Sequence, residues 1–371
     1  MSQTKAQLIA GTSSQDVTFD DATVNSLNGG PLSGFRNRII NSRMRYDQRN
    51  GGSAFTLNSA NAGGTGFAAD RFRSGGIGGT WGTGVISSRV VQVVNTAGGN
   101  YEANSSPSRT VSSNSLKLTV TTAHASPGST TGYGLVHPIE TGHIHDFGWG
   151  TADAKPATLS FWVKSSITGT HCVAVRNGDS TRSYVITYNI AAANTWQYVS
   201  AVISGDTGGT WNDPITDAGL YLNWDLGSGT NNNAAAANTW SNGAFSRVAG
   251  AVSFISTLNA TLYITAVQLE LGSVATPCEP ISLQQELSLC QRYYETGTTK
   301  IFATGVTGTI VIGQTYAVPK RTDSPSITYS APPAGTNSPP TALEWNRSFG
   351  FSANRSTGPE ISFAWASSAE L

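Results

Sequence analysis

The chain has 371 residues, and only 12% of them are charged, about half of the roughly 25% that soluble domains usually carry. The Lys plus Arg residues (22) equal the Asp plus Glu residues (22), and the isoelectric point is near 7.0. Because nucleic-acid binding normally needs a basic patch, this balance argues against DNA packaging, and it argues equally against a role at membrane surfaces.

The sequence shows no targeting or membrane signal. No uninterrupted apolar run approaches the roughly 20 residues of a transmembrane helix. The first seven residues have no cationic start that leads into an apolar core and a cleavage site, so we expect no signal peptide and synthesis in the cytosol. The three cysteines, Cys172, Cys278 and Cys290, have no zinc or disulfide spacing. They are predicted to be buried thiols, Cys172 in a strand and Cys290 on a helix.

The first 35 residues are polar and contain too few apolar side chains to build a core. They predict an extended arm.

The middle of the chain, in contrast, shows alternation of apolar and polar residues. In residues 158–164, Leu159, Phe161 and Val163 take one face and Thr158, Ser160, Trp162 and Lys164 take the other, which indicates a half-buried strand.

The same alternation recurs in residues 116–121, 184–190 and 220–226, where Trp224 shares its face with three leucines. Clusters of Gly, Asn, Asp and Ser at 177–180, 204–209 and 227–233 separate these segments as turns. Short strands joined by frequent turns predict a β-sandwich or a barrel.

One segment is typical of a helix. Ser282 can cap it, with Gln285 three residues later, and Leu283, Leu287, Cys290 and Tyr294 then fall on one face. Beyond it, strands are expected at 309–312, 326–329, 349–351 and 361–365, with a long loop at 331–340. These strands predict a second, smaller β-domain.

Four short motifs bracket the sandwich segment. They are Asn37-Arg38-Ile39-Ile40-Asn41 followed by Tyr46-Asp47-Gln48-Arg49, then Ala69-Asp70-Arg71-Phe72, and near the other end Gln268-Leu269-Glu270-Leu271-Gly272 and Leu289-Cys290-Gln291-Arg292-Tyr293-Tyr294-Glu295. This arrangement resembles the jelly-roll module of bacteriophage tail-fibre and virion proteins, over residues 36 to 295. The sandwich also resembles carbohydrate-binding jelly rolls.

The resemblance and the strand pattern together predict an all-β fold, an antiparallel jelly-roll sandwich with an extended N-terminal arm, one short helix and a small C-terminal β-domain. The expected parts are the arm at 1–35, the sandwich at 36–280, the helix at 281–295 and the C-terminal domain at 296–371. The resemblance implies a virion, with the arm attaching the protein to other tail or baseplate proteins and joining the copies of a homotrimer.

The predicted function is that of a non-enzymatic phage fibre subunit, at the tail, that helps recognise surface polysaccharide of the host. Three alternatives stay open: a purely structural baseplate, head-fibre or decoration protein, a free carbohydrate-binding module, and a polysaccharide depolymerase. No Gly-x-Ser-x-Gly, His-Glu-x-x-His, Walker or Gly-x-Gly-x-x-Gly motif is present. Carboxylates such as Asp206, Asp213, Asp217 and Asp225 are interpreted as solvated turn residues.

Aromatic residues beside the turns supply the candidate glycan site. Sugar rings need apolar faces for stacking and polar groups for their hydroxyls. The candidates are Trp149, Trp211, Tyr221 and Trp240, with Asp213 as a hydrogen-bonding partner. The alternative for each aromatic residue is packing in the core or at a subunit interface.

Two weaker predictions concern metals, and no cofactor is expected. If His143 and His145 lie on a strand, both imidazoles project from one face, and three copies on a threefold axis would present six nitrogens to a transition metal. The alternative is two polar loop histidines beside Asp146. Jelly rolls of this kind often hold a structural calcium ion, for which Asp47 and Glu270 are candidate ligands.

Overall fold

The computed structural model describes residues 35–57, 66–75, 85–92, 114–212, 214–302, 308–330, 341–344, 347–355 and 360–371. The expected N-terminal arm, apart from its last residue, and the expected loop at 331–340 lie outside these ranges. No helix in the described part of the chain is long and apolar enough to cross a membrane.

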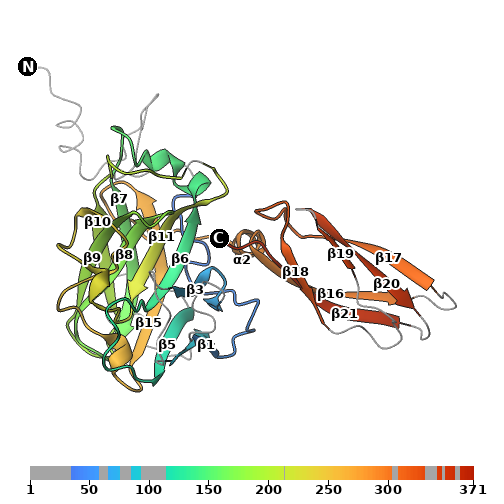
Figure 1. Ribbon diagram of the computed structural model, residues 1–371, viewed down its shortest axis with the longest axis horizontal. Helices are drawn as coiled ribbons and strands as arrows, with labels where there is room; N and C mark the ends of the chain where they lie inside the picture. The colour runs from blue at the N-terminus through green and yellow to red at the C-terminus, as the bar shows by residue number, and fades with distance from the viewer. Residues whose placement is uncertain are drawn as a thin grey trace, which may run out of the picture.

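Two large sheets form the main domain (Figure 1). The six-stranded sheet has the order β1 (Phe55–Leu57), β4 (Val85–Gln92), β5 (Asn114–Thr122), β15 (Thr261–Leu271), β7 (Ala157–Ser165) and β10 (Gln197–Ile203). The seven-stranded sheet has the order β13 (Trp240–Asn242), β9 (Arg182–Ile190), β8 (Gly169–Asn177), β11 (Ala218–Asp225), β6 (Gly134–Glu140), β3 (Phe72–Gly75) and β2 (Phe67–Ala69). Neighbouring strands in both sheets are antiparallel. The predicted antiparallel jelly-roll sandwich is confirmed.

The core lies between the two sheets and is built from the alternating residues that the sequence indicated. From the six-stranded sheet come, among others, Leu116, Leu118, Leu159 and Phe161, and from the seven-stranded sheet Tyr184, Ile186, Leu220, Leu222 and Trp224. Trp224 is completely buried and packs edge-on against Phe161, with ring centroids 5.8 Å apart. Alternation along each strand therefore identified the inward face correctly.

The outward face of β7 is the exception. Thr158 and Ser160 are buried, and Trp162 is only 5% exposed. Trp162 packs with Trp196 and Ala266 in a second apolar cluster on the outside of the six-stranded sheet. The prediction of a half-buried strand is wrong here because other segments cover the face that alternation alone assigned to solvent.

The outside of the seven-stranded sheet is partly covered as well. The short parallel pair β12 (Asn233–Ala234) and β14 (Arg247–Val248) belongs to a segment that packs over β8 and β9. Cys172 is buried there with Val185, and Cys290 is buried on the helix, as predicted. Cys278 is only half-buried, and all three are free thiols.

The bracketing motifs form one buried hydrogen-bond network. The Asn37 side chain donates to Val267 O and accepts from Leu269 N, so the opening motif is tied to β15. Asn41 donates to Asp70 O, which ties the first motif to the second. The residues that carry the family resemblance therefore hold the scaffold together.

The helix α2 (Leu283–Gln291) begins as predicted, because the Ser282 hydroxyl accepts from Gln285 N at 3.2 Å. The predicted buried face is correct only in part. Cys290 is buried and Leu287 is half-buried, but Leu283 is 62% exposed, Glu286 is buried instead, and Tyr294 lies beyond the helix in β16. Arg45, which lies between the two parts of the opening motif, donates to Glu286 at 3.2 Å. The ion pair supplies a counter-charge to the buried carboxylate, so that a charged residue can face inward.

The C-terminal domain contains two three-stranded sheets (Figure 1). One has the order β16 (Tyr294–Phe302), β21 (Glu360–Ser368) and β18 (Ser326–Tyr329), and the other β17 (Gly308–Thr315), β20 (Ser348–Arg355) and β19 (Thr341–Glu344). Tyr316, Phe349, Phe363 and Trp365 form its core. The sequence indicated four of these strands but neither β19 nor β16, which follows α2 directly.

Candidate functional site

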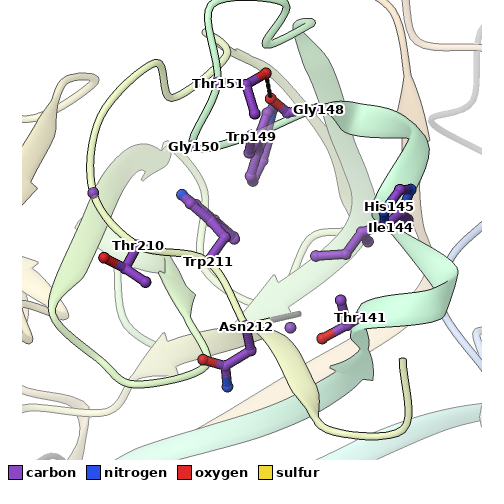
Figure 2. A pocket seen from close by; sticks show the side chains of 12 residues that line it. Thr141, Ile144, His145, Gly148, Trp149, Gly150, Thr151, Thr210, Trp211 and Asn212 are labelled. Carbon is purple, nitrogen blue, oxygen red and sulfur yellow. Dashed lines mark hydrogen bonds between the residues drawn. The ribbon is translucent and has the colours of Figure 1, made fainter. Parts of the chain in front are cut away.

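A cavity of about 460 Å³ lies between two loops at one end of the seven-stranded sheet. One loop follows β6 and contains the 3₁₀ turns η2 (Thr141–His143) and η3 (His145–Phe147). The other precedes β11. Figure 2 shows Trp149 and Trp211 entering the same space, with Thr141, Ile144 and Asn212 around it.

Three tryptophans form the aromatic wall. Trp149 lies edge-on against Trp211 with ring centroids 5.0 Å apart, and against Trp240 with centroids 5.3 Å apart. Trp211 and Trp240 are 5.7 Å apart, also edge-to-face. Each ring thus fixes the other two, and such pairs add about 0.5–1.5 kcal/mol beyond the area they bury.

Hydrogen bonds hold each indole in place. Trp149 donates to Lys155 O at 2.7 Å, Trp240 to Ser204 O at 2.7 Å and Trp211 to Asp206 Oδ2 at 3.2 Å. Only Trp149 is fully buried, whereas Trp211 and Trp240 are half-buried. The half-buried ring of Trp211, which lines the cavity, can offer area to a ligand without leaving its indole N–H unpaired.

Asp206 organises the loop that carries Trp211. Its buried carboxylate also accepts from Arg182, in a bidentate pair, and from Gly208 N. Asp225 is likewise buried and accepts from Gly227 N and Ser228 N. The interpretation of these two aspartates as solvated turn residues is wrong, because both satisfy buried donors.

Gly150 allows the two loops to approach. Its φ is +85°, and a Cβ there would lie 2.7 Å from Trp211 Cδ1. Only glycine combines this backbone conformation with such a close contact.

Polar groups complete the lining. Thr210 and His145 side chains and the Asn212 carbonyl oxygen border the cavity, and none of them has a hydrogen-bond partner among the described residues. The lining residues include no Asp or Glu among those described. The cavity therefore offers apolar ring faces together with neutral donors and acceptors.

The candidate glycan residues are placed differently from one another. Trp149 and Trp211 line the cavity, and Trp240 packs behind them against Tyr184. Tyr221 lies outside the cavity lining, on the outer face of β11. Asp213 lies outside the described residues. Sequence reasoning missed Asn212 and Thr141, since a lone amide or hydroxyl in a turn carries no distinguishing pattern.

His143 and His145 do not lie on a strand, which was the condition for their imidazoles to share one face. The two histidines occupy successive 3₁₀ turns. His143 packs edge-on against Phe35, with centroids 4.9 Å apart, whereas His145 is exposed at the cavity. No group of three or more His, Cys, Asp or Glu side chains suited to a metal occurs in the described ranges. The two imidazoles therefore do not have the strand geometry on which a shared metal site depended, and assembly on a threefold axis stays a prediction.

The candidate calcium ligands are each engaged by their own surroundings. Asp47 accepts from Asn50 N and Gly52 N within its turn. Glu270 is fully buried, accepts from Thr276 N and the Thr276 hydroxyl, and pairs with Arg36 at 3.3 Å. Both carboxylates stabilise turns through these bonds.

His143 gives a pH-dependent prediction. Burial lowers the pKa of His143 to about 4, helped by nearby arginines such as Arg292 and opposed by Glu140. As the pH falls from 6.5 to 4, His143 becomes protonated in the unfolded chain but stays largely neutral in the folded chain, so the free energy of unfolding decreases. The loss is on the order of 2–3 kcal/mol.

His143→Gln removes this titration, so we expect its melting temperature to fall less than that of the parent between pH 6.5 and pH 4. Thermal denaturation of both proteins across pH 4–8 measures the difference, and other titrating groups cancel in the comparison. Parallel curves would contradict the prediction.

No protein-family model matches the sequence, and no curated protein matches it. Among solved structures, similarity is found to the enzymatically active domain of bacteriophage CBA120 tailspike protein 4, with 13% identity over 58% of this chain and a TM-score of 0.29. The chain spans only 21% of that tailspike chain.

Carbohydrate-binding modules are also among the similar structures. The family 11 module from Clostridium thermocellum, in complex with a β-1,3-1,4-mixed-linked tetrasaccharide, has 9% identity and a TM-score of 0.27, covering 60% of this chain and 98% of the module. The N-terminal cellulose-binding domain of Cellulomonas fimi β-1,4-glucanase C has 15% identity and a TM-score of 0.25, covering 44% and 80%. Similarity at this level does not say what this chain binds.

Proposed function

We propose that this protein is a phage fibre subunit, at the virion tail, that binds surface glycan of the host through the cavity between Trp149 and Trp211. The observation that carries the proposal is the cavity itself, which is lined by the edge-to-face indoles of Trp149 and Trp211 together with hydroxyl and amide groups. Sugar rings bind through this combination, because their C–H faces stack on aromatic rings and their hydroxyls need neutral hydrogen-bonding groups.

The virion part of the proposal is supported by the bracketing motifs and by the composition. A surface of hydroxyls and amides with 12% charged residues depends little on salt and pH outside the cell. In this proposal the protein is a homotrimer, because closed cyclic symmetry is the usual arrangement of a repeated structural subunit and fibre subunits are most often threefold. Weak sugar contacts in three copies then act together.

Assembly is tested by light scattering coupled to gel filtration. A particle near three times 38.7 kDa supports the trimer, whereas a stable monomer contradicts it. Immunogold labelling of intact virions tests the tail position and separates it from a head-fibre, baseplate or decoration role.

Trp211→Ala tests the glycan site. We expect at least a tenfold loss of affinity for isolated host surface polysaccharide, because central aromatic anchors contribute about 2 kcal/mol or more. Isothermal titration calorimetry measures the affinity. The matched control is Tyr263→Ala, which removes a half-buried aromatic side chain from the outer face of the six-stranded sheet and should bind like the parent.

The same polysaccharide incubated with the parent protein separates binding from cleavage. In the proposal no reducing ends are released, since the protein is non-enzymatic. Release of reducing ends would instead identify a depolymerase. Equal affinity of Trp211→Ala and the parent would contradict the cavity as the glycan site.

A further inference from the structure

Two arginines meet around Tyr221 on the outer face of the seven-stranded sheet. Arg176 of β8 lies directly opposite Tyr221 of β11 in the strand register, so their side chains share this face. Arg73 of β3 reaches the same place from the other side. The guanidinium carbons of Arg73 and Arg176 lie 5.8 and 5.9 Å from the centre of the Tyr221 ring.

Arg176 is exceptional among the buried arginines of the described residues. Arg38, Arg71 and Arg247 each form an ion pair with a carboxylate. Arg176 is 5% exposed and has no carboxylate within ion-pairing distance in the described part of the chain. A buried charge without a counter-ion is costly and is rarely retained for stability alone.

Three buried polar atoms of this cluster are also unpaired, although the Arg73 side chain forms a hydrogen bond with Tyr221. The Nε atoms of Arg73 and Arg176 are buried and have no hydrogen-bond partner among the described residues. The same holds for Oδ1 of Asn223, which follows Tyr221 on the same face of β11. Burial lowers the pKa of Arg176 to about 10, with Tyr221 opposing and Arg73 adding to the effect, so both guanidinium groups stay charged at neutral pH.

This cluster lies near the cavity on the same strand. Gly219 lines the cavity, and Tyr221 follows two positions later on β11, about 7 Å along the strand. Thr141 and Ile144 cover the outward side of Gly219, where a Cβ would lie 2.7 Å from Thr141 Cα, so the cluster is a neighbouring site and not a continuation of the cavity.

We propose that Arg73, Arg176 and Tyr221 form a subsite for the carboxylate of an acidic sugar, so that the protein recognises an acidic polysaccharide. The inference rests on the proposed glycan binding and adds the class of sugar. Guanidinium groups present parallel N–H donors that match a planar carboxylate, and the half-buried Tyr221 ring beside them can stack against a sugar ring. A free phosphate shares the anionic chemistry, and the experiment separates the two.

The test uses the full chain and titration calorimetry with galacturonate oligosaccharides, with glucuronate oligosaccharides and with the methyl esters of both. We expect one of the acidic series to bind at least tenfold more tightly than its neutral ester. Arg176→Met should reduce that affinity to the level of the ester. Lys117→Met, the matched control, removes the same charge from the six-stranded sheet and should leave the preference intact.

Thermal denaturation shows whether Arg176→Met is folded, and we expect its melting temperature to equal or exceed that of the parent, because an uncompensated charge is removed. If the variant does not fold, Arg73→Gln, at a half-buried position, replaces it. Inorganic phosphate should compete with the acidic oligosaccharide only weakly, since it cannot stack on Tyr221. Competition by phosphate at equal concentration would overturn the sugar carboxylate in favour of a simple anion site.

Failure of this inference and failure of the glycan proposal give different results. If host polysaccharide binds in a Trp211-dependent way but acidic sugars and esters bind equally or not at all, the carboxylate subsite is wrong and glycan binding stands. If no polysaccharide or oligosaccharide binds, both are wrong.

Discussion

Replacing Arg71 with methionine should lower the free energy of unfolding by about 3–5 kcal/mol. Arg71 is 1% exposed and joins the sandwich to the C-terminal domain. It forms an ion pair with Glu370, donates to Pro138 O at 2.8 Å and lies 3.5 Å above the ring centre of Tyr293. Methionine preserves most of the volume but leaves the carboxylate and the carbonyl without this donor.

Denaturant unfolding followed by tryptophan fluorescence measures the loss, and limited proteolysis should cut the variant near residue 292, where the domains join. Asp146→Asn is the control. It weakens the ion pair between Asp146 and Arg38, in which the Asp146 side chain is 48% exposed, so this variant should lose less than about 1 kcal/mol of stability. If Arg71→Met lowers the free energy of unfolding by no more than this control does, Arg71 is not the anchor between the domains.

The inward faces of the strands could be read from the sequence, because alternation with period two reports directly which side chains meet the core. Leu220, Leu222 and Trp224 show this. The outward faces could not be read in the same way. Trp162 is covered by Trp196 and Ala266. Contacts between segments so far apart in the chain leave no periodic signal in the sequence of either segment.

The helix shows the same limit from a different cause. Its start depended on Ser282 and Gln285, which are local, and was predictable. Its buried face depended on Glu286 meeting Arg45, 241 residues away. Hydrophobic periodicity points to Leu283 instead, because a paired carboxylate and a solvated one look identical in sequence.

The candidate site was predictable in its residue types and not in its arrangement. Composition and turns pointed to Trp149, Trp211 and Trp240 as aromatic residues near loops. Only the fold shows that they touch, since 62 and 29 residues separate them along the chain. Arg73 and Arg176 gave no signal, because only the folded chain shows that neither has a carboxylate partner among the described residues.

Replacing Trp149 with alanine should cost about 3–5 kcal/mol of stability and abolish glycan binding as well. The side chain is 6% exposed and supports both other indoles. Its removal opens a void beneath Trp211, so the cavity wall loses its fixed geometry. This distinguishes Trp149 from Trp211, whose half-buried ring can be removed with a smaller loss of stability.

Trp149→Phe is the matched variant, since it keeps a ring against Trp211 and Trp240 while it loses the bond to Lys155 O. We expect it to lose about 1–2 kcal/mol and to retain most of the affinity for polysaccharide. Denaturant unfolding and calorimetry on the three tryptophan variants measure both quantities. If Trp149→Ala stays as stable as Trp211→Ala, the two side chains have the same role, and Trp149 contacts the ligand without supporting the wall.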